Sequence, residues 1–555
     1  MIMKKVYIFL AVAATALLGL NSCIKEFEPE ESVVTESQVG ASPTALGSMV
    51  ASIPSTMYMG GYALSDGQLS YDFGIPGICV MRDSALDDLV ILGDSGYDWF
   101  STFAGVEYRG YQYSTTYLPW YTFYPLIKGV NDIIRSILAN GIENASDQQK
   151  IYLGMAYAYR AYYYMHLNDV YEYKENKYVT PEDPAVVGLS CVIVDENTDE
   201  SGAKYNPRAT AKQVFELINA DLEHAREYLN GYTQTSFMEP DYIVACALSA
   251  RAYLAQSNWT EAQKWAQEVL DKSGKTPLTK DQWQDPQNGF NSYSAASNSW
   301  IWGVGLTPEN TFNLHNFIAH MSTEEEWTSY GCKVARGINK YIYEKISDYD
   351  WRKQSWLDPD RSKFQYKTCL DANASTSRHP TKDLNSLPDY TNIKFRPAQG
   401  NYANYKIGAV NDFPMIRIEE MYFIKAEAQA HTSLSEAVTT LNNFMKYRWL
   451  SSENPYDCSS AASNAEFFTN ELYQQKRVEF WGEGIMFTDA KRLGVGTKNG
   501  YPGTNVTGDE YLLNTEGVAP WWTFPICRAE LLVNTAIPTT LNNPDPTGSV
   551  SPWKE

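Results

Sequence analysis

Histidine and cysteine, on which many catalytic and metal sites depend, are scarce in this sequence of 555 residues, with only 6 His and 8 Cys. It contains no C-x-x-C pair and no H-E-x-x-H, G-x-S-x-G or P-loop motif. Beyond Cys23 an odd number of cysteines remains, so neither a disulfide framework nor a zinc site is indicated. We therefore predict a protein that is not an enzyme and that carries no metal or other cofactor.

Basic residues are also in the minority. There are 45 Lys and Arg against 66 Asp and Glu, which gives a net charge of −21. A nucleic-acid partner would require clustered Lys and Arg to neutralise its phosphates, and no such cluster is present. We therefore expect no nucleic-acid partner. With 44% hydrophobic and 20% charged residues, the composition is that of a globular protein.

The one long apolar run lies at the N-terminus and is typical of a targeting segment. Lys4 and Lys5 precede an uncharged stretch, 6–20, which is shorter than the roughly 20 residues that a transmembrane helix needs. The segment ends in Leu20-Asn21-Ser22-Cys23, which resembles a bacterial lipobox. We expect residues 1–22 to be a lipoprotein signal peptide and Cys23 to carry acyl chains that hold the protein at a membrane. An ordinary secretory peptide with an incidental cysteine is the alternative.

Several segments show the 3.6-residue apolar period of amphipathic helices. Two pairs of them, 242–257 with 260–271 and 415–431 with 434–449, share a pattern of small residues around a short break. Each pair spans about 33 residues, which suggests tetratricopeptide-like hairpins. The pairs are not tandem in the sequence. Further helices are expected at 117–139, 147–171, 211–229 and 466–492.

Aromatic residues are unusually frequent, at 14% of the chain. Many of them fall in 275–410, a stretch that is also rich in Ser, Asn, Asp, Gly and Pro. Irregular segments attached to a rigid helical scaffold commonly carry binding surfaces. Because aromatic rings are platforms for ligands with flat apolar faces, we expect this stretch to present rings to a ligand.

Short motifs follow one another in a characteristic order over nearly the whole chain. They are the lipobox, Asp87-Asp88-Leu89-Val90, Asp98-Trp99-Phe100, residues 120–134, residues 154–164 with Arg160-Ala161, residues 414–420 with Ala426-Glu427-Ala428, residues 477–484, residues 489–492 and residues 524–527. Each motif is weak alone, but their order resembles the SusD/RagB family of surface lipoproteins, which capture nutrients for TonB-dependent outer-membrane transporters. Departures from the family pattern, at Lys476, Met486 and Cys527, concern the scaffold.

The resemblance implies an all-α fold in which tetratricopeptide-like helical hairpins form one scaffold and long irregular insertions carry the binding surface. It also implies a protein without catalysis, lipid-anchored in the outer membrane, facing the cell exterior, with a SusC-like TonB-dependent transporter as its partner. The expected organisation is a signal peptide at 1–22, an acidic tether at 23–45, an N-terminal helical region at 46–274, an aromatic-rich loop insertion at 275–410 and a C-terminal region with helical hairpins at 411–555.

A glycan site needs an exposed ring with short polar side chains nearby, because a sugar presents an apolar C–H face and a rim of hydroxyls. Trp99 fits best, since the turn-rich stretch before it would expose the ring and the family's glycan-binding members use this position. Asp98 and Arg82 are expected to contact hydroxyl groups. The other candidate rings are those of Trp283, Tyr293, Trp300 and Trp327. For each ring the alternative is a side chain that covers the helical core.

We therefore expect the protein to bind oligosaccharide or polysaccharide and to deliver it to the transporter. Capture of peptides or protein-derived nutrients is the alternative on the same fold. Acidic peptides would be disfavoured, since removal of residues 1–22 takes away two lysines and makes the net charge −23. A surface glycoside hydrolase, with Asp87 and Asp88 as its carboxylate pair, is the alternative from a different class.

Overall fold

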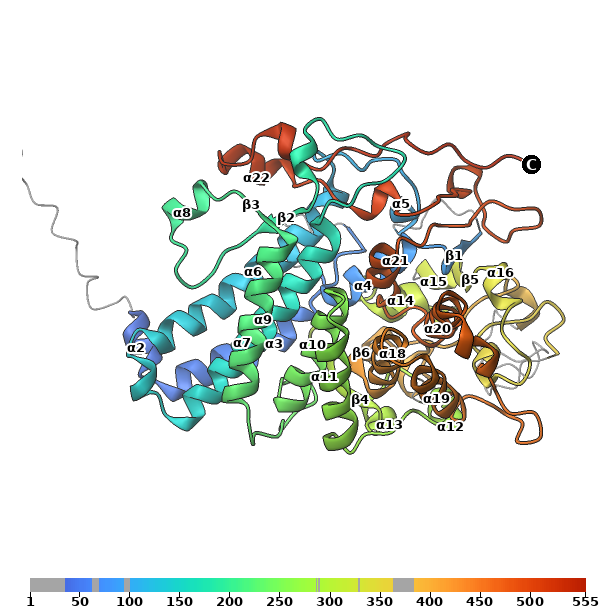
Figure 1. Ribbon diagram of the computed structural model, residues 1–555, viewed down its shortest axis with the longest axis horizontal. Helices are drawn as coiled ribbons and strands as arrows, with labels where there is room; N and C mark the ends of the chain where they lie inside the picture. Colours follow the sequence, from blue (N-terminus) through green and yellow to red (C-terminus); the bar gives the residue numbers. More distant parts are fainter. Residues whose placement is uncertain are drawn as a thin grey trace, which may run out of the picture.

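The structure is a computed structural model that describes residues 35–61, 69–93, 100–285, 287, 290–327, 330–362 and 384–555. These residues form a mostly helical fold with three two-stranded antiparallel sheets (Figure 1). The all-α class expected from the sequence is confirmed. The longer helices are α3 (Pro43–Met57), α6 (Ser114–Leu138), α7 (Asp147–Tyr171), α9 (Ala211–Tyr228), α10 (Tyr242–Ala255), α11 (Trp259–Lys272), α18 (Ile418–Ala430), α19 (Leu434–Met445) and α20 (Ala465–Glu479).

Shorter elements connect and cover these helices. The short helices are α2 (Glu36–Gly40), α4 (Ile75–Ser84), α5 (Ser101–Ala104), α8 (Glu200–Lys204), α12 (Lys280–Trp283), α13 (Tyr293–Ala296), α14 (Phe317–Met321), α15 (Tyr330–Lys333), α16 (Lys340–Tyr343), α17 (Tyr405–Gly408), α21 (Met486–Leu493) and α22 (Arg528–Val533). The strands are β1 (Leu89–Leu92), β2 (Leu189–Val192), β3 (Arg208–Thr210), β4 (Trp300–Gly305), β5 (Ala335–Ile338) and β6 (Asp412–Arg417).

The scaffold is a row of antiparallel helices in which each packs against the next. Helix α7 lies between α6 and α9, followed by α10, α11, α18, α19 and α20 (Figure 1). The two predicted hairpins, α10 with α11 and α18 with α19, are therefore confirmed. Although 275–410 separates them in the sequence, α11 packs directly against α18. The two hairpins are thus adjacent repeats in space. The chain leaves the row of helices after α11 and returns to it at α18, beside the helix that it left.

Helix α9 shows why these segments fold as they do. Thr210 caps its N-terminus in a reciprocal capping box with Gln213, which satisfies amides that the first turn leaves open. Val214, Ile218 and Leu222 follow at helical spacing and are buried against α7 and α10. The apolar period of the sequence therefore predicts which face of α9 packs against its neighbours.

Two of the predicted helices have different bounds in the structure. The segment 415–431 begins as strand β6 and becomes helical only at Ile418, because residues up to Arg417 pair with β4. The segment 466–492 is not one helix but two, α20 and α21. The break contains Gly482 and Gly484, both at positive φ (80° and 73°), where a helix cannot continue. A Cβ atom at residue 484 would also lie 2.5 Å from the Cβ of Cys79.

The expected acidic tether at 23–45 overlaps the folded part of the protein. Helix α2 begins at Glu36 behind a capping box formed by Thr35 and Gln38, and it packs against α6. Helix α3 begins at Pro43. A tether that reaches residue 45 is therefore wrong, since the chain is already helical from Glu36.

The stretch 275–410 is not a surface insertion in its described parts. Its strand β4 pairs with β6, and its strand β5 pairs with β1, so it is tied into the scaffold on both sides. Trp283, Trp300 and Trp356 are among the largest fully buried side chains of the described chain. The abundance of aromatic residues here serves the core, because irregular chain without long helices needs large side chains to fill the space between its segments.

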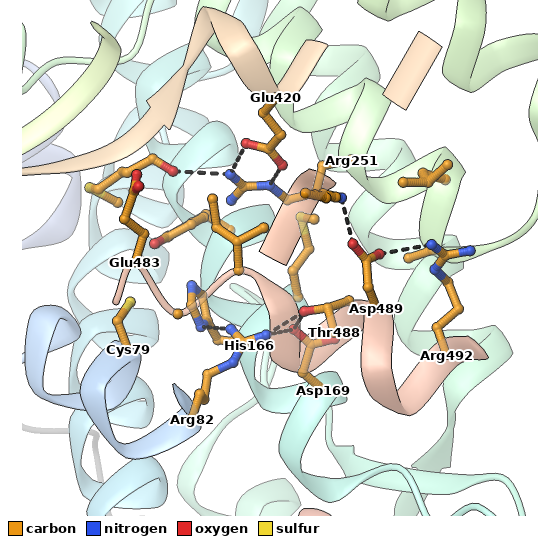
Figure 2. Close-up of a pocket in the computed structure, with 18 of the residues that line it drawn as sticks. Cys79, Arg82, His166, Asp169, Arg251, Glu420, Glu483, Thr488, Asp489 and Arg492 are labelled. Atoms are coloured by element: carbon orange, nitrogen blue, oxygen red, sulfur yellow. Dashed lines mark hydrogen bonds and ion pairs between the residues drawn. The ribbon is translucent and has the colours of Figure 1, made fainter. Parts of the chain in front are cut away.

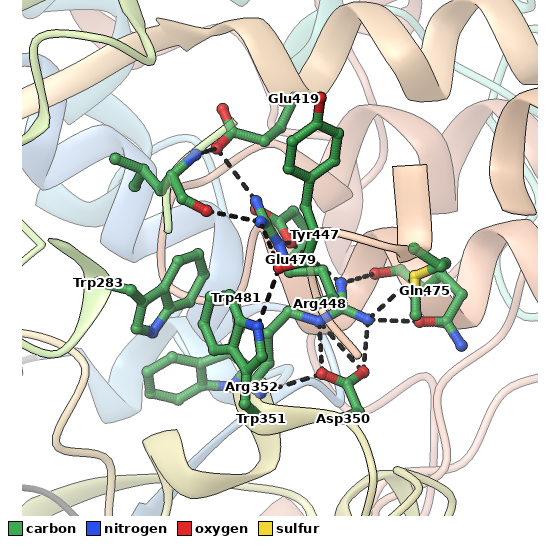
Figure 3. Close-up of polar contacts among 12 residues, drawn as sticks. Trp283, Asp350, Trp351, Arg352, Glu419, Tyr447, Arg448, Gln475, Glu479 and Trp481 are labelled. Atoms are coloured by element: carbon green, nitrogen blue, oxygen red, sulfur yellow. Dashed lines mark hydrogen bonds and ion pairs between the residues drawn. The ribbon is translucent and has the colours of Figure 1, made fainter. Parts of the chain in front are cut away.

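A buried carboxylate joins four segments of this core. Glu479, at the end of α20, accepts hydrogen bonds from Arg352 at 3.0 Å and from Arg448 at 2.8 and 2.9 Å (Figure 3). It also accepts a hydrogen bond from Arg417 at 3.1 Å. All four side chains are almost completely buried. Burial opposes ionisation of Glu479, but the three guanidinium groups outweigh it and keep its pKa well below the ordinary range. Arg352, Arg417 and Arg448 come from three separate segments, so Glu479 fixes their relative positions.

We expect Glu479→Gln to lower the free energy of unfolding by about 3–5 kcal/mol, because it leaves three buried guanidinium groups without their shared counterion. Equilibrium denaturation of both proteins measures this loss. The control is Glu36→Gln, which removes an exposed ion pair with Arg135 and should cost no more than about 1 kcal/mol. Equal losses in the two variants would contradict the central role of Glu479.

Candidate functional site

Three of the expected functional residues lie outside the described residues. Trp99 and Asp98 fall in the segment 94–99, and Cys23 precedes residue 35. Their expected roles in glycan contact and in lipidation stay predictions.

Three of the expected ligand-binding tryptophans are buried. Trp283 is fully enclosed: its Nε1 donates to Ser355 Oγ at 2.9 Å, and the Lys394 ammonium lies 4.6 Å from its ring centroid. Trp300 in β4 is also fully buried, and Trp327 is nearly so. A ring whose faces are covered by protein cannot stack on a sugar. The expectation that these three rings are open to a ligand is therefore wrong, and the alternative, a ring that covers the core, is correct for them.

Arg82 is likewise directed into the interior. Its side chain, on α4, points toward α7, where Nη2 donates to Asp169 at 2.7 Å and Nη1 donates to His166 Nδ1 at 2.9 Å; it also contacts Thr488 on α21 (Figure 2). Burial, with the charge of Arg82, keeps the pKa of His166 well below its ordinary value, so the imidazole is neutral and can accept this bond. Arg82 is only 3% exposed. Its expected contact with ligand hydroxyls is replaced by contacts that join three helices.

The cavity beside Arg82 is too small for a sugar. It lies between α4, α7, α10 and α21 and has a volume of about 50 Å³. A cavity of this size holds a few water molecules. Its charged side chains are already paired, Arg251 with Glu420 at 2.6 Å and Arg492 with Asp489 at 2.8 Å. This interior pocket therefore belongs to the scaffold.

Tyr293, by contrast, lines an open cleft. The cleft has a volume of about 720 Å³ and is bordered by the loop 231–241, the start of α10, the end of α11 and α13. Tyr293 is half-buried, and its ring stacks on that of Phe237, with centroids 4.1 Å apart and planes 12° apart. Tyr232 and Tyr242 are further rings in the wall. Of the predicted rings in the described chain, Tyr293 alone borders an open cleft.

Strand β4 and its neighbours hold this ring pair in place. Buried Trp300 packs against both rings, with its centroid 6.3 Å from that of Phe237 and 6.1 Å from that of Tyr293. The amide of Gly303 donates to Phe237 O at 3.0 Å, and the amide of Tyr293 donates to an Asp412 carboxylate oxygen at 2.8 Å. The ring pair is therefore positioned by regular structure although it belongs to a loop and a short helix.

Polar side chains surround the ring pair. Thr233, Gln234, Thr235 and Ser236 line the same cleft. Gln234 donates through Nε2 to Ile301 O at 3.2 Å, while its Oε1 is buried and has no hydrogen-bond partner among the described residues. That oxygen can accept a hydrogen bond from a ligand hydroxyl. Rings beside short hydrogen-bonding side chains form the combination that a sugar requires.

Three charged residues line the cleft, Asp241, Lys272 and Lys275, of which Lys272 is paired with Glu268 at 2.7 Å. Lys275 donates to Ser297 O at 2.7 Å, and its Nζ lies 5.9 Å from the centroid of the Tyr293 ring. Burial lowers the pKa of Lys275. Asp241 is buried and accepts from the amide of Val244, so it caps α10 and is committed to the scaffold.

The cleft continues into a second hollow of about 640 Å³. Tyr232 and Thr235 line both, and the second hollow extends along α3 and the start of α7. The two hollows therefore adjoin at Tyr232 and Thr235.

The sequence analysis overlooked Tyr232 and Phe237. The signal was the segment from Gly231 to Phe237, in which two rings flank four short polar residues between two helices. A polar, turn-rich stretch also precedes Trp99, but the connection 231–237 is shorter and lies outside 275–410.

No site for a metal and no membrane span is found in the described chain. Nowhere in it do three or more His, Cys, Asp or Glu side chains gather as metal ligands. Over the same residues, no helix combines the length and the apolar character needed to cross a bilayer.

Comparison with known families identifies the scaffold. The SusD family model matches residues 263–538, and a second model, described as "Starch-binding associating with outer membrane", matches residues 94–254. Together they span most of the described helices, and the chain belongs to the SusD/RagB family. None of the curated proteins matches the sequence.

Solved structures share the fold at low sequence identity. A SusD-like carbohydrate-binding protein from Bacteroides vulgatus is 19% identical, with a TM-score of 0.68 over 90% of this chain and 98% of that one. A SusD superfamily protein from Bacteroides thetaiotaomicron is 18% identical, with a TM-score of 0.65 over 91% and 100%. A laminarin-binding SusD-like protein is 18% identical, with a TM-score of 0.60 over 90% and 99%. These likenesses establish the architecture.

The interior pocket leads to a prediction of pH dependence. Asp83, next to Arg82, accepts from the amide of Gly484 at 2.9 Å, and burial raises the pKa of its carboxyl from 3.8 to about 8. The folded state thus keeps a proton that the unfolded chain releases, so the contribution of Asp83 to stability falls as the pH rises from 3.8 to about 8. We expect Asp83→Asn to reduce this fall, measured by chemical denaturation at the two ends of the interval. The control is Asp271→Asn, at an exposed residue, which should leave the change in unfolding free energy between the two pH values unaltered. An equally unaltered change in Asp83→Asn would contradict the role of Asp83.

Proposed function

We propose that this protein is a cell-surface lipoprotein that binds oligosaccharide or polysaccharide and delivers it to a partner TonB-dependent outer-membrane transporter. The observation that carries the proposal is the open cleft in which the stacked rings of Phe237 and Tyr293 stand beside the polar side chains of 233–236. Membership of the SusD/RagB family supports it, as do the starch-binding, outer-membrane description of the matched model and the laminarin-binding relative.

The chemistry of the cleft suits a sugar. The apolar face of a pyranose can lie on the phenol ring of Tyr293, while its hydroxyls reach Gln234 and its neighbours. The rings are pre-positioned by β4 and β6, so little conformational freedom is lost on binding. The cleft is wide and open, which favours modest affinity and the release that hand-off to a transporter requires.

The structure also bears on the hydrolase alternative. Both acidic side chains considered for it, Asp87 and Asp88, are buried and form ion pairs with Arg477. Neither borders the cleft around Tyr293. This supports a receptor that holds its ligand without cleaving it.

We expect Tyr293→Ala to weaken glycan binding by about 1 kcal/mol, or roughly fivefold in Kd, because one stacking ring is lost. Affinity electrophoresis and calorimetry with laminarin and soluble starch measure this. The melting temperature should change little, since the side chain is half-buried. The matched control is Tyr205→Ala, an exposed tyrosine outside the cleft.

Trp99→Ala is expected to weaken retention of the same glycans without a large loss of stability. A large stability loss with retained binding would mean that Trp99 is part of the core.

For Tyr293, unchanged binding in a folded variant would contradict the proposal. Peptide binding with no response to any glycan would favour the peptide-capture alternative, and reducing ends released from a glycan would favour a hydrolase.

The proposed lipid anchor has its own test. Cys23→Ala removes the thiol that would carry the acyl chains, so we expect the protein to move from the membrane fraction to the soluble fraction. Fractionation together with incorporation of labelled fatty acid measures this. A variant that stays in the membrane fraction would contradict anchoring through Cys23.

A further inference from the structure

A second open cleft lies at the α20 end of the helical row and shares no lining residue with the cleft around Tyr293. It has a volume of about 590 Å³. Its floor is one face of α20, and its walls are residues 345–350 and the chain that follows α19, including Trp449 and Tyr456. The Glu479 network lies at the C-terminal end of the same helix, and Asp350 belongs both to the wall and to a buried pair with Arg352 (Figure 3). The wall of this cleft is therefore tied to the buried Glu479 network through Asp350 and Arg352.

Aromatic rings form a continuous edge along one side. Trp449 stands between Tyr349, at 6.1 Å between centroids, and Tyr456, at 5.3 Å. The indole is fixed by a hydrogen bond from Nε1 to Asn454 O at 2.6 Å. Tyr349 is 45% exposed, and Phe467, on α20, is 52% exposed. Trp449 and Tyr456 line the cleft and are partly buried, Phe467 lines it and is exposed, and Tyr349 lies beside Trp449 outside the lining.

Hydrogen-bonding side chains lie along α20 beside these rings. Asn470, Glu471 and Gln474 recur at helical spacing and line the cleft. Glu471 accepts through Oε1 from Tyr456 OH at 2.5 Å and from Gln475 Nε2 at 2.9 Å, and it forms no ion pair among the described residues. Gln474 Nε2 is buried but has no acceptor in the described chain. A buried donor without an acceptor is costly, and a ligand oxygen placed in the cleft would satisfy it.

We propose that this cleft is a second glycan-binding site. The ring edge supplies the apolar platform, Gln474 donates to a ring or hydroxyl oxygen, and the Glu471 carboxylate accepts from hydroxyl groups. The inference rests on the proposed function, since both sites would contact the same class of polymer.

With two sites on one molecule, the affinity and the stoichiometry of binding depend on the length of the glycan. A hexasaccharide engages each site separately, so two equivalents bind. A polysaccharide long enough to reach both is held more tightly than either site alone would hold it, because the second contact becomes intramolecular. The loss of either site should therefore affect a polymer more than a hexasaccharide.

The test is calorimetry on the full mature chain in detergent with maltohexaose, laminarihexaose, soluble starch and laminarin. For a glycan that binds, Trp449→Ala should lower the hexasaccharide stoichiometry from two to one and weaken polymer binding by about tenfold or more. Phe467→Ala and Glu471→Gln alter the cleft more mildly. If Trp449→Ala does not fold, these two variants replace it, and each should weaken binding of the second hexasaccharide equivalent. The matched control is Leu450→Ala, an exposed apolar neighbour outside the lining, which should leave both measurements unchanged.

The outcomes separate this inference from the proposed function. If the wild-type protein binds one equivalent that Tyr293→Ala weakens and the α20 variants do not, the second site is overturned while the proposed function stands. If the wild-type protein binds none of the four glycans, both are overturned.

Discussion

The carboxylate of Glu479 is the interaction on which the rest of the structure depends. It receives three guanidinium groups from segments that are far apart in the sequence, at Arg352, Arg417 and Arg448. These contacts connect α20 to β6, to the chain after α19 and to the stretch 275–410. Arg417 is the last residue of β6, which pairs with β4, and Trp300 of β4 packs against the ring pair of the first cleft. A buried ion cluster thus positions a site in which it takes no direct part.

Aromatic residues have two different roles in this fold. Fully enclosed rings, such as Trp283 and Trp300, fill the irregular core and cover buried cations. Half-buried rings, such as Phe237 and Tyr293, stand on that core and face a cleft. A binding platform needs both kinds, because a ring can be exposed and still rigid only if other side chains hold it. The high aromatic content therefore reflects core and surface together.

Much of the scaffold could be predicted from local sequence pattern. The small-residue hairpins and the capped, striped helices such as α9 are local features, and they appear as expected. The break between α20 and α21 does not show in the apolar period, because that period resumes beyond the break. Gly482 and Gly484 are the residues that mark it. The exposure of single rings could not be predicted. Tyr293 and Trp300 lie seven residues apart in similar sequence surroundings, and only strand pairing, a long-range contact, places one in the cleft and the other beneath it.

The account rests on the claim that a sugar lies against the rings of Phe237 and Tyr293. Amide hydrogen exchange, measured with and without a glycan that binds, tests this most directly, because it locates the contact without altering the protein. The account predicts slower exchange in residues 231–241 and 292–296 when the glycan is present. Binding of the glycan with no change in exchange in either segment would contradict it.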